Sequence, residues 1–164
     1  MKKKHLNIVI VLGALLMALI LRSFILSVYK IPTNSMEPTF LPGDFIFASK
    51  VAYGFKLPFS KSVWFGSAPQ KGDLVIFKFK GKPEITYVKR VTAIAHETIE
   101  MKDGTQQTVP EGEIFVANDN DSIKDENQEG FVSVPDIDGQ AKIIWFSSTK
   151  DSGIRWQRIF SAPR

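Results

Sequence analysis

A long apolar run at the N-terminus constrains this chain more than any other feature. Residues 6–28 are nearly all apolar, with Arg22 near the far end, where a long basic side chain can reach lipid head groups. A helix needs about 20 such residues to cross a bilayer. Lys2, Lys3 and Lys4 precede the run, and a basic flank favours the cytoplasmic side. We therefore expect residues 1–28 to form a cytoplasmic N-terminus and one transmembrane anchor, with residues 29–164 as an extracytoplasmic domain.

A cleaved signal peptide is the alternative interpretation of the same run. A basic start and an apolar centre fit both interpretations. However, no pair of small residues marks a cleavage site after the run, because Arg22, Phe24, Tyr29 and Lys30 occupy that region. The run is also longer than a usual signal-peptide core. These two observations favour a retained anchor.

Charge and composition exclude several classes of function. Five of the 21 basic residues and none of the 17 acidic ones fall in the first 30 positions, so the remaining chain is close to neutral. A near-neutral body argues against nucleic-acid binding. The absence of cysteine excludes disulfides, thiol catalysis and cysteine-ligated zinc. We expect no metal site and no cofactor.

The pattern of the remaining chain is typical of strands and turns. Short segments rich in β-branched and aromatic residues are bounded by glycine and proline, and no helical periodicity follows the anchor. The strand candidates are residues 44–48, 73–79, 85–94, 114–117, 131–134 and 143–147. This pattern predicts a soluble all-β domain of antiparallel sheets, forming a partly closed barrel. Residues 55–70 suggest a loop or hairpin that either touches lipid or forms a small hydrophobic cluster.

Ser35 is the candidate nucleophile. It lies shortly after the apolar run, in the sequence Ser-Met-Glu-Pro-Thr. A serine hydroxyl attacks only when a base removes its proton. The two histidines are poor candidates for this base, because His5 lies at the cytoplasmic edge of the anchor and His96 is expected in a surface turn.

Lys89 is the candidate base. In a strand over residues 85–94, side chains alternate between two faces. The more apolar face would contain Ile85, Tyr87, Lys89, Val91 and Ala93. Burial among apolar groups lowers the pKa of a lysine, so that its neutral amine can accept a proton. The alternative is an ordinary strand lysine whose amine reaches solvent at a sheet edge.

Several segments resemble, in order, the conserved boxes of the type I signal peptidases, which remove signal peptides from exported proteins. They are residues 31–39, 43–46 with 53–54, 72–77, 87–91 and 154–160. The resemblance implies that Ser35 is the acylating nucleophile and Lys89 the general base of a serine endopeptidase. It also implies an oxyanion hole formed by the Ser35 backbone N–H and the Thr33 hydroxyl.

The resemblance further implies shallow pockets for small substrate side chains, often alanine. Tyr29, Ile31 and Val88 would help line these pockets. The expected partners are the signal peptides of secretory precursors and membrane lipid. The expected location is the bacterial plasma membrane, with the catalytic domain on the outer side.

One acidic segment, residues 118–130, departs from the family pattern. Asn118 stands where the family usually has glycine, Asn127 stands where arginine is expected, and the stretch is one residue short. Ser122 is the expected hydroxyl that orients the lysine. This departure leaves two alternatives open: a specialised peptidase of conjugation or pilus assembly, or a catalytically silent relative that binds signal peptides.

Overall fold

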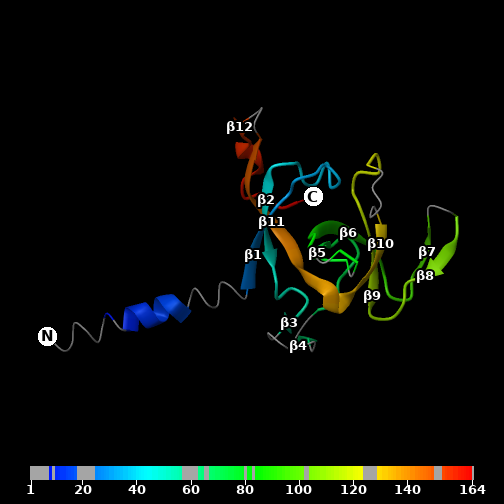
Figure 1. Ribbon diagram of the computed structural model, residues 1–164, viewed down its shortest axis with the longest axis horizontal. Coiled ribbons are helices and arrows are strands. Elements are labelled where there is room, and N and C mark those ends of the chain that lie inside the picture. The colour runs from blue at the N-terminus through cyan, green and yellow to red at the C-terminus, as the bar shows by residue number, and fades with distance from the viewer. Residues whose placement is uncertain are drawn as a thin grey trace.

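The computed structural model describes residues 8, 10–17, 25–56, 63–64, 67–79, 81–82, 84–101, 104–123, 129–149 and 153–163. Most of them form antiparallel β-structure (Figure 1). The main sheet has the order β1-β2-β11-β5-β6-β9-β10, and β12 pairs with β11. Its strands are β1 (Leu26–Lys30), β2 (Asp44–Ser49), β5 (Leu74–Phe77), β6 (Tyr87–Ile94), β9 (Glu113–Ala117), β10 (Glu129–Ser133), β11 (Ile137–Thr149) and β12 (Gly153–Ile154).

Two small hairpins and two single turns of 3-10 helix complete the described elements. The hairpins pair β3 (Phe55–Lys56) with β4 (Val63–Trp64), and β7 (Thr98–Glu100) with β8 (Gln106–Thr108). The 3-10 turns are η1 (Val134–Asp136) and η2 (Trp156–Arg158). The β3–β4 pair confirms a hairpin within residues 55–70, but its side chains lie outside the described residues, and so does their predicted contact with lipid or with a hydrophobic cluster.

The all-β prediction is confirmed, since each of the six strand candidates overlaps an observed strand. The alternation of inward-facing and outward-facing side chains explains why these segments form strands. In β2, buried and half-buried residues alternate along the whole strand, so one face packs inward. β11 is the exception in length, because it extends over 13 residues where only 143–147 were predicted. It pairs with β2 along one part and with β5 along another, and irregularities in register interrupt both ladders.

The partly closed barrel is not confirmed. Among the described strands, β1 and β10 end the order and do not pair with each other, so the sheet is open.

The N-terminal expectation needs one correction. The predicted anchor extended to residue 28, whereas the last three positions of that span belong to β1 and pair with β2. Helical residues are described at 8, 10–17 and 25. Within the described ranges, no helix combines the length and the apolarity that a membrane crossing requires. The transmembrane anchor therefore stays a prediction.

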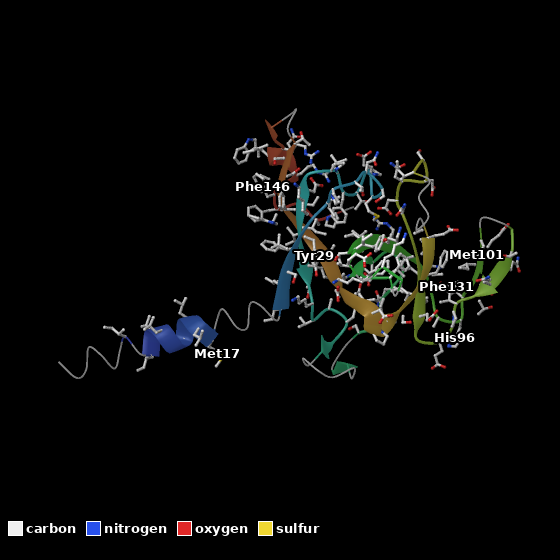
Figure 2. The ribbon with its side chains drawn as sticks, viewed as in Figure 1. Met17, Tyr29, His96, Met101, Phe131 and Phe146 are labelled. Carbon is white, nitrogen blue, oxygen red and sulfur yellow. The ribbon has the colours of Figure 1, made fainter. Side chains whose placement is uncertain are left out.

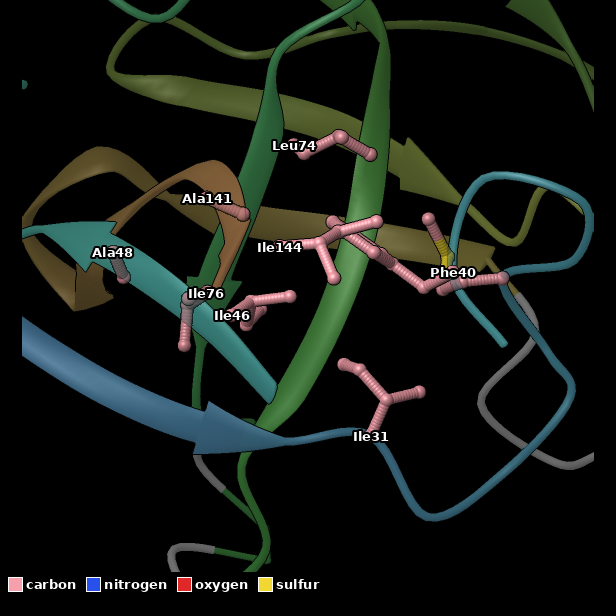
Figure 3. Packing of buried hydrophobic residues seen from close by; sticks show 9 residues of the cluster. Ile31, Phe40, Ile46, Ala48, Leu74, Ile76, Ala141 and Ile144 are labelled. Carbon is pink, nitrogen blue, oxygen red and sulfur yellow. The ribbon is translucent and has the colours of Figure 1, made fainter. Parts of the chain in front are cut away.

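A hydrophobic core lies beneath the N-terminal strands and the segment that follows β1 (Figure 3). Its buried members are Ile31, Met36, Phe40, Ile46, Ala48, Leu74, Ile76, Ala141 and Ile144, and Tyr29 and Val88 pack against it. Met36 and Phe40 are 2% and 0% exposed, so they anchor the turns around Ser35 in this core. Packing of this density restricts the backbone on either side of the serine.

Candidate active site

Ser35 lies in a series of turns between β1 and β2. The Phe40 N–H donates to the Met36 carbonyl at 2.8 Å, which closes one of these turns. The turns return to the sheet at Gly43, whose φ is +89°, and a Cβ there would collide with the Ser148 carbonyl oxygen. Only glycine fits such a close approach with a positive φ. The Thr33 Oγ1 lies 3.0 Å from the Ser35 Oγ, so the two hydroxyls predicted to act together are adjacent.

Lys89 lies on the inward face of β6. It is 2% exposed, and Val91 and Ala93 on the same face are also buried, whereas Thr92 on the opposite face is exposed. The predicted alternation is therefore confirmed for these positions. It does not extend to Ile85, which precedes β6 and is 43% exposed. The strand opposite Lys89 is β5, which is buried along its whole length.

Three consecutive residues after β9 connect Lys89 to the Ser35 turns. The Lys89 Nζ donates to the Asn118 Oδ1 at 2.5 Å. The Asn120 backbone N–H donates to the Ser35 carbonyl at 3.0 Å, and its Nδ2 donates to the Asn34 carbonyl at the same distance. Asn118, one of the predicted departures from the family pattern, is therefore part of the segment that holds the site.

Asp119, between these two asparagines, forms a forked ion pair with Arg90. The Arg90 Nε and Nη2 each lie 2.7 Å from a carboxylate oxygen of Asp119. Thr39 donates to the same carboxylate at 2.5 Å. Hydrogen bonding to Asp119 raises the pKa of Arg90, while partial burial acts in the opposite direction. The pair fixes the segment after β9 against β6 and against the turns beyond Ser35.

A cavity of about 180 Å³ brings the predicted site residues together. It is lined by Tyr29, Ile31, Thr33, Ser35, Val88, Lys89 and Asn118, with Lys30, Pro32, Met36, Ile85, Thr86 and Tyr87 completing the wall. Six of these positions are the ones to which a catalytic, oxyanion or substrate-binding role was assigned. Burial, followed by the charge of Asp138, raises the pKa of Tyr29. The small volume and mainly apolar lining suit a small apolar side chain.

Ser122 and His96 lie elsewhere. Ser122 is exposed, is not among the residues that line the cavity, and donates its backbone N–H to the Asn120 Oδ1 at 3.1 Å. The Lys89 amine instead donates to Asn118, a contact that the sequence did not reveal. His96 is exposed in the turn after β6, as expected, and lies well away from Tyr29 (Figure 2).

A second polar cluster, centred on Asp44, supports the turns that follow Ser35. Asp44, at the start of β2, is fully buried and contacts Arg155 at 3.0 Å and Arg158 at 2.7 Å. The Ser147 hydroxyl donates to the same carboxylate at 2.6 Å. Arg158 also donates to the Thr39 carbonyl at 2.9 Å. The C-terminal segment is thereby joined to the chain between Ser35 and β2.

Two adjacent hydroxyls and a buried amine line one cavity, and these are the groups that a serine hydrolase with a lysine base would need. Comparison with known sequences agrees with this class. The family described as "Signal peptidase, peptidase S26" matches residues 6–106, and the chain belongs to this family.

Similar relatives are named Signal peptidase I. That of Buchnera aphidicola subsp. Baizongia pistaciae is 44% identical over 86 residues, which cover 52% of this chain and 28% of the relative. That of Pseudomonas aeruginosa is 41% identical over 87 residues, covering 52% and 30%. That of Aquifex aeolicus is 37% identical over 86 residues, covering 52% and 29%. The matched part thus covers less than a third of each relative.

Proposed function

We propose that this protein is a membrane-bound serine endopeptidase that cleaves signal peptides from exported precursors. The observation that carries the proposal is the single cavity that Ser35, Thr33 and the buried Lys89 share. Family membership supports the same reaction. The presence of both hydroxyl and amine favours an enzyme over a silent peptide-binding relative.

The proposed reaction proceeds through an acyl-enzyme. The neutral Lys89 amine removes the Ser35 proton while the Ser35 oxygen attacks the scissile carbonyl carbon. The Ser35 backbone N–H and the Thr33 hydroxyl donate to the oxygen that becomes negative. Lys89 then returns the proton to the leaving amine, which carries away the mature protein. Water, activated by the same lysine, hydrolyses the ester and releases the signal peptide.

The proposed location is the outer face of the bacterial plasma membrane. Several large apolar side chains remain exposed on β1, an edge strand of the main sheet, and on the C-terminal segment. Leu26 and Val28 are 42% and 44% exposed, and Trp156 and Phe160 are 73% and 74% exposed. Exposed aromatic and aliphatic side chains of this kind suit the interface between lipid and water.

A cleavage assay tests both the activity and its side of the membrane. Detergent-solubilised protein should cut a secretory precursor once, after a residue with a small side chain. Right-side-out vesicles should cut the same precursor when it is added from outside. Mapping of the new N-terminus by mass spectrometry gives the bond. Cleavage after large side chains, or only by inverted vesicles, would contradict the proposal.

A specialised processing peptidase is the second candidate, and the Asn118 side chain favours it. This residue lines the substrate cavity and stands where the family pattern has glycine. A side chain there reduces the space for substrate. Cleavage of one dedicated precursor, with general secretory precursors left intact, would identify this narrower role.

Thr33 provides a test of the oxyanion hole. Thr33→Val keeps the shape of the side chain but removes the donor, so turnover should fall by about 10²–10³ with little change in KM. Thr33→Ser restores a hydroxyl and should retain most of the activity. If Thr33 only fills space, the order reverses, with valine tolerated and serine mildly harmful. Thr98→Val, at an exposed position of β7, is the control.

A further inference from the structure

We infer that Asn118 is the positioning residue for the catalytic lysine, holding its amine through a neutral acceptor. The inference rests on the proposed function, in which Lys89 is the base. Asn118 and Lys89 are 7% and 2% exposed, and their side chains are joined by the 2.5 Å contact. A short hydrogen bond between two buried groups has little competition from water.

The lysine needs such a partner because of its own flexibility. Its amine ends a stem with several rotatable bonds. A neutral amine has two hydrogens and one lone pair, and only the lone pair can accept the Ser35 proton. When one hydrogen is directed at the Asn118 Oδ1, the rotation that remains to the lone pair is restricted. Asn118 therefore acts on the reaction through Lys89, and its acceptor matters mainly to turnover.

Asn118 is itself held on both sides. β9 ends at Ala117, directly before it. Asp119, directly after it, forms the forked pair with Arg90, and the Asn120 backbone donates to Ser35. The backbone on either side of the acceptor is therefore fixed, which a positioning residue requires.

The charge of the acceptor is the decisive property. A carboxylate next to the amine would favour the ammonium form and raise the pKa of the lysine. Among the described residues that line the cavity, none has a carboxylate; the titratable ones besides Lys89 are Tyr29 and Lys30 on β1 and Tyr87 on β6. The strand paired with Lys89, β5, has no titratable residue. Asp119, adjacent in sequence, is paired with Arg90. An amide thus provides an acceptor without the charge that would inactivate the base.

Asn118→Asp tests this inference, because it changes the charge and almost nothing else. The rate of a lysine base rises with pH as the amine loses its proton. With a carboxylate at 118, the rising limb of kcat/KM should move to higher pH by about one unit or more. Activity at neutral pH should fall about tenfold or more and recover largely on the alkaline plateau. Asn118→Ala should lower kcat about tenfold at every pH, with KM within about twofold and no alkaline shift.

Gln107→Glu makes the same amide-to-carboxylate change at an exposed position of β8 and should leave the profile unmoved. A second measurement does not depend on cleavage. ¹³C NMR of the lysine Cε groups should show one resonance that disappears in Lys89→Met and titrates at higher pH in Asn118→Asp than in the native protein.

The outcomes distinguish the positioning role from the proposed function. If Asn118→Asp moves neither the rate profile nor the Lys89 titration, the positioning role is wrong while the proposed function stands. The positioning role is equally wrong if both variants only lower the melting temperature and reduce activity to the same extent at all pH values. If the native protein cleaves no precursor, the proposed function fails, and the NMR titration still decides whether Asn118 controls the state of Lys89.

Discussion

Replacement of either Ser35 or Lys89 should reduce precursor cleavage to less than about one part in 10⁴ of the native rate. Ser35→Ala removes the nucleophile. Lys89→Met keeps most of the buried stem and removes the amine that accepts the proton. Because the two groups act in one step, the double variant should be no slower than either single variant. Quantitative mass spectrometry of the released signal peptide measures the residual rate.

Two comparisons make this result specific. Lys71→Ala removes an exposed lysine that pairs with Glu97, and it should cleave at the native rate. Near-UV circular dichroism of the inactive variants should match that of the native protein, since neither change removes much of the core. Cleavage above about one-hundredth of the native rate by the purified Ser35 or Lys89 variant would remove that residue from its assigned role.

Asp44→Asn should lower the free energy of unfolding by about 3 kcal/mol. The substitution leaves the guanidinium groups of Arg155 and Arg158 without their carboxylate, and removing one partner of a buried ion pair costs about 3–5 kcal/mol. The lower end applies because the two arginine side chains are 20% and 24% exposed. Urea unfolding followed by tryptophan fluorescence measures the change.

Glu111→Gln, the same change at an exposed turn position, should alter stability by less than about 0.5 kcal/mol. Asp44→Asn should also reduce cleavage, because the cluster includes the Thr39 carbonyl beyond the Ser35 turns. A loss of stability below about 1 kcal/mol would show that the arginines find other partners.

Local pattern was enough to predict six of the eight described strands of the main sheet and the inward orientation of Lys89. β6 could be predicted because apolar Val91 and Ala93 alternate with polar Arg90 and Thr92, which places Lys89 on the same face as the apolar pair. β1 could not, because its alternation is hidden by the apolar run that continues into it. The length of β11 was missed because its irregular register breaks the period of two on which strand recognition depends.

The side-chain contacts that complete the site could not be predicted from the spacing of residues in the sequence. Lys89 and Asn118 are 29 residues apart in the chain, and Asp44 and Arg158 are 114 apart. In a sequence, Asp44 and the two arginines look like ordinary surface charges, since charged residues are seldom buried. Asn118 was noted only as a departure from the glycine of the family pattern, because its hydrogen bond to Lys89 depends on the fold that brings β9 beside β6.

Because β1 begins at Leu26, the connection between the N-terminal apolar run and Ser35 is short. Residues 25–35 lead from the last part of the apolar run, which continues into β1, to Ser35, and even fully extended they span no more than about 35 Å. In the proposed arrangement, with that run as a membrane anchor, Ser35 would stay within this distance of the lipid, however the rest of the domain turns. The choice of the bond to be cleaved would then depend partly on its distance from the membrane. A small residue would be followed by cleavage only when the substrate holds it at the same distance from the lipid as Ser35.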